Sequence, residues 1–377
     1  MKKLLSIVFI VVVFIGCTPK QEVEINIPNE KVNKDLGKPI TNDFDIGEKI
    51  GKEEIESLDP LDIKEDEFSF VSDGKSINIA VVYPSRIVGR YAKTSMNTIL
   101  GYLAFMNANY NVKVYDTENE NIENISKAFE NLKTDGFEKV IALFTPRASN
   151  ILHELDTSSL KVYLPLSNKS DNETFKENFV YGAISYDRQI KKLLEYSNIK
   201  NTMFYQDSYI GKKLKEKYEV QVPVTLRTKM IKNKRNYFKG IVKDYKLKNS
   251  TLFLNTKLVK TSIILSQLRA YDIEPKVILS TQLNFDPRII ALTQEKDREN
   301  FVVASSIDKV DDKLIDIIKM YGGDIEYSWV DYSTLVGINY LYESNVSNGI
   351  NTKIEENKVI YEPKLYKTTR FGFLEIK

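Results

Sequence analysis

The side chains that most often serve as nucleophiles, metal ligands or redox groups are scarce in this chain. Its 377 residues include one Cys, Cys17, and one His, His153. One Cys cannot form an intramolecular disulfide or a Cys-x-x-Cys site, and one His cannot build a His-rich metal centre. The GxSxG, P-loop and HExxH motifs are missing, and no GxGxxG opens the first expected helix. We therefore predict a non-enzymatic protein with no metal and no cofactor, in which His153 is a surface or half-buried helix residue.

Cys17 directly follows a short apolar run near the N-terminus. Lys2 and Lys3 precede residues 4–15, which are apolar apart from Ser6. A basic start and a short apolar stretch are typical of a signal peptide, whereas a spanning helix needs about 20 apolar residues. Residues 13–17 resemble the lipobox of bacterial lipoproteins, which implies a signal peptide over 1–17 and a membrane anchor on lipidated Cys17. The alternative is a cleaved signal peptide with an incidental Cys.

The predicted anchor places the protein in a bacterial envelope, facing the periplasm. In enteric lipoproteins, an Asp directly after the lipidated Cys bears on sorting between the two membranes. This chain has Thr18 at that position. This favours the outer membrane over the inner one.

Residues 18–75, between the anchor and the rest of the chain, are acidic overall. They contain 16 acidic residues and 8 Lys, a net charge of −8, and their only aromatic residues are three Phe. Such a composition buries too little apolar surface to offset chain entropy, so we predict a disordered tether. The tether is either a plain spacer or a means of reaching toward the cell wall.

The rest of the chain, 76–377, is basic. The total of +2, less +2 for Lys2 and Lys3 and less −8 for the tether, leaves +8. Clusters at Lys229–Arg235 and Lys243–Lys248 could meet anionic polymers or acidic partners, or could be solvated faces of a Lys-rich protein. Because no nucleic-acid-binding motif is present, we expect no nucleic-acid partner.

Apolar strands and amphipathic helices alternate from Ser76 onward, which predicts parallel sheets built from βαβ units. We expect strands at 77–83, 112–115, 140–144, 162–164, 202–205, 222–226, 252–254, 277–279 and 301–304. We expect helices at 90–106, 122–132, 187–196, 209–218, 237–245, 258–270, 312–321 and 332–343. The fold class is thus α/β with two doubly wound parallel-sheet lobes, since one sheet of ten or more strands is less common. We assign 76–182 plus 305–345 to lobe 1 and 183–304 plus 346–377 to lobe 2, with crossings near Tyr181, Ile307 and Ser344.

Several short stretches resemble the type I periplasmic-binding-protein superfamily. They are Ile79–Ser85, Phe179–Tyr181 with the following Asp187-Arg188-Gln189, and Asp331-Tyr332 at the start of a late helix. Gly89–Ala92 and Val112–Thr117 are more narrowly similar to penicillin-binding-protein-activator lipoproteins. The chain departs from those activators in having the acidic tether where they carry a helical-repeat domain. Its opening loop, 85–90, also differs from the Gly/Ser-rich turn of amino-acid binders.

The resemblance implies ligand contacts in loops that follow the strands, because α/β proteins bind ligands at strand C-termini. The matching positions are Ser85, Arg86, Thr145, Arg147, Ser149, Ser167, Gln206, Asp207, Tyr209, Asn255 and Thr281, with Gln282 as a substitute for the last. Arg86 and Arg147 could pair with a carboxylate or phosphate. Thr145 before Pro146 is equally suited to cap a helix. Tyr186 and Tyr209 could form walls of a pocket.

The resemblance supports two functional hypotheses. The first is an envelope lipoprotein whose bilobal domain binds a protein partner, as the activators bind a peptidoglycan synthase, and so regulates peptidoglycan synthesis. The alternative is a receptor that binds an amino acid or similar small-molecule ligand and delivers it to a membrane transporter. Both hypotheses share one architecture, so the fold does not decide between them.

Overall fold

The computed structural model describes residues 67–172, 174–343 and 349–376. The predicted signal peptide, Cys17 and the tether as far as residue 66 lie outside the described residues. The predicted tether boundary at 75 is wrong, because β1 (Glu67–Phe70) pairs antiparallel with β3 (Asn109–Asp116). Phe68 in β1 packs against the core, which ties this segment to the folded body.

The first sheet has eight strands in the order β1-β3-β2-β4-β5-β6-β13-β12. Its other strands are β2 (Ser76–Tyr83), β4 (Lys139–Ala142), β5 (Lys161–Leu164), β6 (Phe179–Tyr181), β12 (Lys353–Glu355) and β13 (Lys358–Ile360). Along β2, Ile79 and Val81 enter one hydrophobic core while Ala80 and Val82 enter another. Successive strand residues point to opposite faces, so both faces of this sheet are buried.

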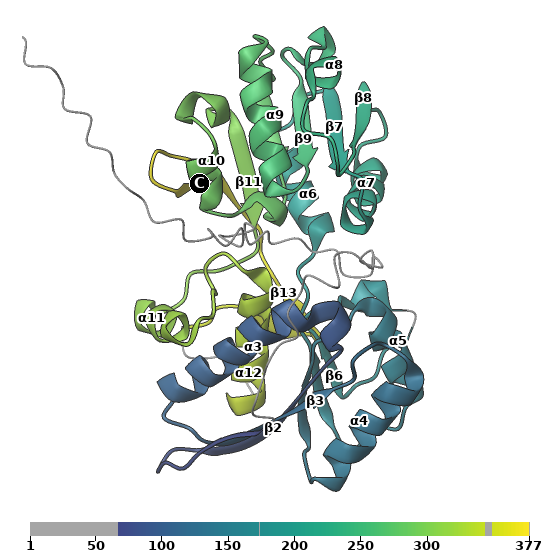
Figure 1. Ribbon diagram of the computed structural model, residues 1–377, viewed down its shortest axis with the longest axis vertical. Helices are drawn as coiled ribbons and strands as arrows, with labels where there is room; N and C mark the ends of the chain where they lie inside the picture. The colour runs from purple at the N-terminus through teal and green to yellow at the C-terminus, as the bar shows by residue number, and fades with distance from the viewer. Residues whose placement is uncertain (1–66, 173, 344–348, 377) are drawn as a thin grey trace, which may run out of the picture. The chain divides into compact units, whose positions relative to one another are not determined.

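Helices cover the two faces of the first sheet (Figure 1). α4 (Ile122–Thr134) and α5 (Pro146–Glu154) bury residues such as Phe129 and Leu152 in one core. The other core lies under α3 (Ser85–Phe105), against which α11 (Asp312–Tyr321) and α12 (Trp329–Glu343) pack. Two helices from late in the sequence thus complete the first sheet.

The second sheet has seven strands in the order β15-β14-β11-β10-β9-β7-β8. They are β7 (Asn201–Gln206), β8 (Arg227–Ile231), β9 (Thr251–Asn255), β10 (Val277–Ser280), β11 (Phe301–Ser305), β14 (Lys364–Thr368) and β15 (Phe373–Ile376). α6 (Tyr186–Leu194) and α7 (Tyr209–Gln221) contribute to one core, and α9 (Leu258–Ala270) and α10 (Arg288–Leu292) to the other. Two α/β sheets with helices on both faces confirm the predicted fold class.

The structure corrects two expected elements of the second sheet. The strand expected at 222–226 lies at 227–231, because α7 continues to Gln221 and Val222 fills the core beneath the helix end. The helix expected at 237–245 is reduced to α8 (Lys239–Val242) and a 3-10 turn at Tyr245–Leu247. Phe238 and Val242 pack into the core here, and the intervening Gly240 has a low helix propensity.

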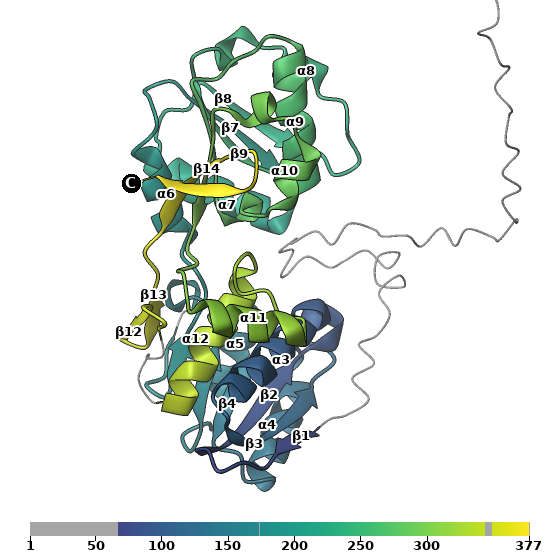
Figure 2. The same cartoon turned by 90° about the vertical axis from the view of Figure 1, so that its left-hand side faces the viewer.

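The C-terminal residues assigned to lobe 2 are divided between the two sheets. β12 and β13 belong to the first sheet, and β14 and β15 belong to the second (Figure 2). The third crossing therefore lies at 361–363, between β13 and β14, and not near Ser344, which is outside the described residues. Tyr361 fixes this crossing, because its buried hydroxyl donates to the carbonyl of Gly182 over 2.5 Å in the first crossing.

α12 lies deep in the first core. Thirteen of its 15 residues are buried, which is the pattern of a helix surrounded by protein on all sides. Tyr163 of β5 lies across the helix and donates its hydroxyl to the carbonyl of Ser333 over 2.9 Å. A Cβ atom at Gly337 would lie 2.3 Å from the Tyr163 ring, so only glycine permits this approach.

We expect Gly337→Ala to lower the free energy of unfolding by about 1–3 kcal/mol, because the added methyl overpacks a fully buried ring. Chemical denaturation of the full chain measures this. Gly240→Ala is the matched control, since a Cβ atom there meets nothing within 4 Å and α8 gains helix propensity. Equal stability of Gly337→Ala and the wild type would show that the ring moves aside without cost.

Asp331, in the first turn of α12, is a fully buried carboxyl. Thr94 donates its hydroxyl to Oδ1 over 2.7 Å, and the backbone N–H of Asp324 donates to Oδ2 over 2.9 Å. Burial nevertheless dominates and raises the pKa of Asp331 to about 7. The folded state therefore holds a proton that the unfolded chain has already lost near its ordinary pKa of 3.8.

The stability supplied by protonated Asp331 is complete below pH 3.8 and is lost as the pH rises toward 7. We expect Asp331→Asn to flatten the fall of unfolding free energy across this window. Denaturant titrations at several pH values measure the slope. Asp316→Asn, an exposed position on α11, should keep the wild-type slope; equal slopes in all three proteins would contradict the assignment to Asp331.

Candidate functional site

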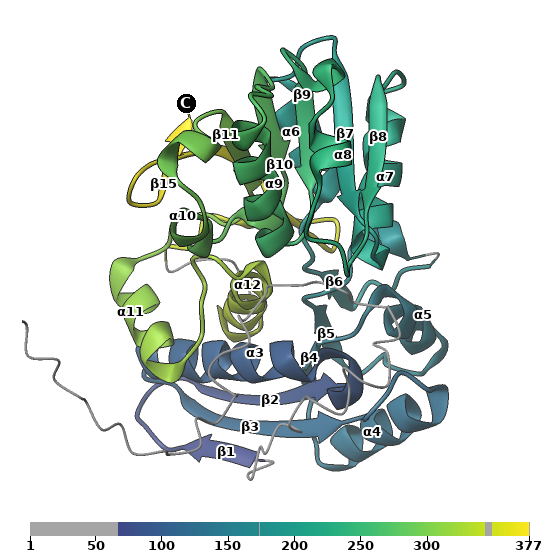
Figure 3. The same ribbon diagram turned by 45° about the horizontal axis from the view of Figure 1, so that its top comes forward.

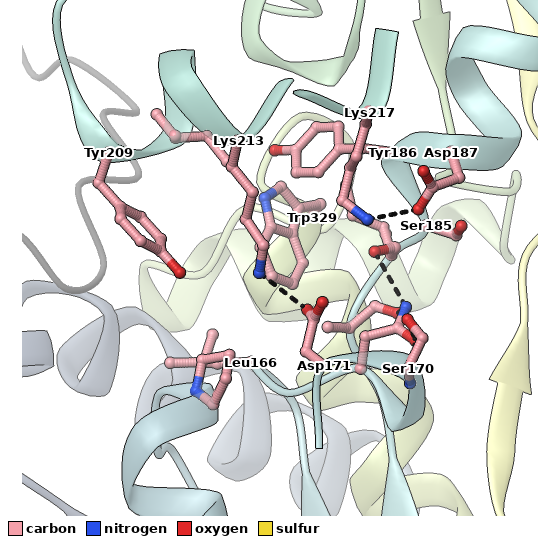
Figure 4. Close-up of a pocket in the computed structure, with 15 residues that line it drawn as sticks. Leu166, Ser170, Asp171, Ser185, Tyr186, Asp187, Tyr209, Lys213, Lys217 and Trp329 are labelled. Atoms are coloured by element: carbon pink, nitrogen blue, oxygen red, sulfur yellow. Dashed lines mark hydrogen bonds and ion pairs between the residues drawn. The ribbon is translucent and has the colours of Figure 1, made fainter. Parts of the chain in front are cut away.

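A pocket lies where α7, the start of α6, the loop after β5 and the first residue of α12 come together (Figure 4). The cavity has a volume of about 70 Å³, which is several times the volume that one water molecule needs. Its lining includes residues of both sheets' helices and loops. They are Pro146, Leu166, Asn168, Ser170, Asp171, Ala183, Ile184, Ser185, Tyr186, Asp187, Tyr209, Ile210, Lys213, Lys217 and Trp329.

The charged groups of the pocket are paired with one another. Lys213 on α7 lies 3.2 Å from the carboxylate of Asp171, and Lys217, one turn further, bonds to Asp187. Figure 4 shows both ammonium groups directed at these carboxylates across the pocket. The four charges sum to zero, so a ligand ion would have to displace a partner that is already in place.

Aromatic side chains form much of the remaining wall. Tyr186 is half-buried, but its hydroxyl is buried, which raises the pKa of the phenol well above the ordinary value, so it stays protonated. Trp329 is 5% exposed and is the single Trp of the chain. Tyr209 is 41% exposed, which leaves its ring accessible. The pocket therefore combines two neutralised lysines with an aromatic surface suited to apolar or ring-shaped groups.

Of the residues predicted from sequence, Tyr209 and Tyr186 line this pocket and the others do not. The two arginines are not part of the lining: Arg86 forms an exposed ion pair of 2.8 Å with Glu118, and Arg147 is exposed on α5. Ser85 starts α3, where its backbone N–H donates to Asp116 over 3.0 Å. The expected arginine clamp on an anionic ligand is therefore not assembled in the pocket.

Thr145 occupies the predicted N-cap position, with Pro146 at the first helical position of α5. Its hydroxyl, however, donates to the carboxylate of Glu120 over 2.8 Å, and its backbone N–H donates to the other oxygen over 3.0 Å. Burial raises the pKa of Glu120, against the opposing effect of these two hydrogen bonds. Thr145 therefore acts as an anchor for a buried acid.

Most of the remaining predicted residues are bonded to other residues of the protein, several of them in a different loop. Asn255 Oδ1 accepts from the backbone N–H of Thr281 over 3.1 Å and from its hydroxyl over 3.2 Å. The other contacts, in sequence order, are Ser167 with Asn172, Gln206 with Asn233 and with the backbone of Lys257, Asp207 with Lys212, and Gln282 with Gln189, Ser305 and Ser306. Ser149 is buried, and within the described residues its hydroxyl has no hydrogen-bond partner.

His153 is half-buried on α5, as predicted, and its Nε2 lies 2.7 Å from the hydroxyl of Tyr181. Burial lowers its pKa, so the ring is neutral at physiological pH. Across the described ranges no three His, Cys, Asp or Glu side chains gather in a way that could hold a metal ion. Among the helices of those ranges none is both long and apolar enough to cross a bilayer.

Sequence reasoning missed the charged half of the pocket. Lys213 and Lys217 are four residues apart on a helix whose start was predicted, so their common face was available from the sequence. Trp329 could have been singled out as the sole Trp. Asp171 carried no signal, because its position depends on how the loop after β5 folds back toward α7.

Comparisons with known proteins bear on the fold. No known protein family and no curated protein matches the sequence. A structure described as a putative branched-chain amino acid ABC transporter from Rhodospirillum rubrum superposes with a TM-score of 0.63 at 8% identity, covering 80% of this chain and all of that one. LivJ from Streptococcus pneumoniae, in complex with isoleucine, gives 0.53 at 11% identity, with 80% and 100% coverage.

A protein with a different name is also similar in fold. Full-length LpoA from Haemophilus influenzae superposes with a TM-score of 0.56 at 10% identity, covering 81% of this chain and 60% of LpoA. At sequence identities this low, the superpositions support a common fold but do not indicate a ligand. Both the two-sheet topology and these superpositions lead to one conclusion: the described part of this chain has the type I periplasmic-binding-protein fold.

Proposed function

We propose that this chain is a non-enzymatic envelope binding protein whose folded body binds a protein partner, a peptidoglycan synthase. The observation that carries the proposal is the internal bonding of the loops that would otherwise hold a small solute. Thr145 is bonded to Glu120, Asn255 to Thr281, and Arg86 to Glu118. A free amino acid needs donors and acceptors that are open to it, and the acceptor oxygens of Glu120, Asn255 and Glu118 are already used in these pairs.

The energetics point the same way. Each buried hydrogen bond contributes about 0.5–1.5 kcal/mol, and a buried group left without a partner costs about 1–3 kcal/mol. An amino acid entering these loops would break several such bonds and would have to replace each of them. Its carboxylate and ammonium would also compete with the Lys213–Asp171 and Lys217–Asp187 pairs. A partner that contacts the outer surface avoids these costs.

The similarity in fold to LpoA supports a protein partner, as does the sequence resemblance to penicillin-binding-protein activators. A lipid on Cys17 followed by the long acidic tether would let a membrane-anchored protein reach such a partner. Outer-membrane attachment remains part of the proposal.

The test is a titration of the full chain into a purified bifunctional penicillin-binding protein from the same cell. We expect a saturable complex and a change in the rate of peptidoglycan synthesis at the same concentrations. A solute receptor of the same fold, such as a LivJ-type protein, is the control and should do neither. If no synthase of the cell binds the chain, or if the control binds equally well, the proposed partner is wrong.

The pocket favours one second candidate, a small ligand with an apolar or aromatic group. Tyr209, Tyr186 and Trp329 surround a space large enough for such a group, and Lys213 could exchange Asp171 for a ligand carboxylate. In this case the chain would act as a solute receptor that delivers an amino acid, short peptide or cell-wall fragment to a transporter.

Trp329 provides a direct measurement, because it is the sole Trp and lines the pocket. Under the protein-partner proposal, its fluorescence should not change when amino acids, short peptides or cell-wall fragments are added to the full chain. A saturable change that Lys213→Ala weakens at least tenfold would establish the receptor function instead. Lys215→Ala is the matched control, since Lys215 lies on the same helix in an ion pair with Glu219, outside the pocket.

A further inference from the structure

The net charge of the folded body is concentrated in one segment. Residues 227–248 contain nine Lys and Arg and one Asp, a net of +8, which equals the whole excess of residues 76–377. The rest of that range is therefore neutral overall. We call residues 227–248 the basic segment.

The cations of the basic segment are held at the surface and few are neutralised. Arg227 pairs with Asp244 over 2.8 Å. Seven others are exposed and have no ion-pair partner among the residues that the structure describes, namely Lys232, Lys234, Arg235, Lys239, Lys243, Lys246 and Lys248. Mutual repulsion of so many like charges is unfavourable unless an anionic group approaches them.

The basic segment also exposes apolar groups and an unpaired strand edge. Tyr237 is 59% exposed, Tyr245 73% and Met230 39%. β8 ends the strand order of the second sheet, and within the described residues it pairs with β7 alone (Figure 3). Lysines on an edge strand also discourage edge-to-edge aggregation. That role does not explain Lys248, which lies well beyond the end of β8 at Ile231.

The acidic charge of the N-terminal region is equally concentrated. Residues 18–42 contain four acidic residues and four Lys and are neutral overall, whereas residues 43–66 contain ten acidic residues and three Lys, a net of −7. Seven apolar side chains alternate with these acids, namely Phe44, Ile46, Ile50, Ile55, Leu58, Leu61 and Ile63. We call residues 43–66 the acidic segment; it ends directly before β1.

We propose that the basic segment is the docking surface for the acidic segment of the same chain. The charges of +8 and −7 nearly cancel, and the acidic segment brings apolar side chains to the exposed Tyr237, Tyr245 and Met230. Opposite charges supply the long-range attraction, and apolar contact supplies a component that salt does not screen.

Covalent connection favours this occupant over a separate acidic partner. The acidic segment is attached to the folded body at Glu67, so it meets the basic segment of the same molecule at an effective concentration that does not depend on the protein concentration. A segment of 24 residues extends to about 80 Å at most, so it can cover a surface far from its attachment at Glu67. Even weak complementary contacts are populated under these conditions.

The experiment is amide hydrogen exchange followed by mass spectrometry on the full chain at low and high salt. We expect peptides covering 227–248 to exchange at least fivefold more slowly in 20 mM salt than in 500 mM salt. The triple variant Lys232→Glu, Lys234→Glu, Lys239→Glu should remove this protection, as should Glu53→Lys, Glu54→Lys, Glu56→Lys. Combining the two triple variants should restore it, which loss of folding could not do.

The matched control reverses three exposed lysines elsewhere, Lys127→Glu, Lys296→Glu and Lys313→Glu, and should keep the wild-type protection. Protection that grows with protein concentration would show that a second copy supplies the acidic segment and would overturn the proposal. Protection that appears after addition of phosphatidylglycerol vesicles, and not without them, would assign the basic segment to a lipid surface. Exchange that is the same in every variant would show that nothing docks there.

Discussion

The contact between Tyr163 and the backbone at Gly337 is the constraint on which much of this structure depends. It seats α12 within the first core, and α12 in turn positions Trp329 at the wall of the pocket. The same tyrosine bonds to the carbonyl of Ser333, whose hydroxyl lies 2.8 Å from the carbonyl oxygen of Gly182 and 3.1 Å from that of Pro165. One close approach of ring to backbone therefore fixes a core helix, the loop after β5 and the first crossing between the sheets.

The electrostatics of the molecule separate into two regimes. Around the pocket, acids and bases are matched one to one within a few ångströms, which leaves little free charge for an incoming ion. At the basic segment, cations accumulate without matching acids in the described residues. Paired charges near the pocket favour a fixed geometry, whereas unpaired charges at the surface favour association with another segment or molecule. Recognition is therefore better supported at the surface than within the pocket.

Much of the fold could be predicted because buried parallel strands leave a strong sequence signal. The run Ile77–Tyr83 and the alternation of strands with helices sufficed for the fold class. The short strand β12 was missed, since two of its three residues are Lys353 and Glu355 and it is held by pairing with β13 rather than by its own apolar character. The loop residues were assigned by strand order alone, and strand order does not say that Thr145 meets Glu120, 25 positions earlier. Pairings between distant loops depend on the finished fold.

The division of the C-terminal residues between the sheets sets an order in which the protein can form. β13 joins the first sheet and β14 the second, and they are separated by residues 361–363. Neither sheet can complete its set of strands until almost the entire chain has left the ribosome or the translocation channel. During that interval partly built sheets expose apolar faces, which makes the incomplete fold prone to aggregation.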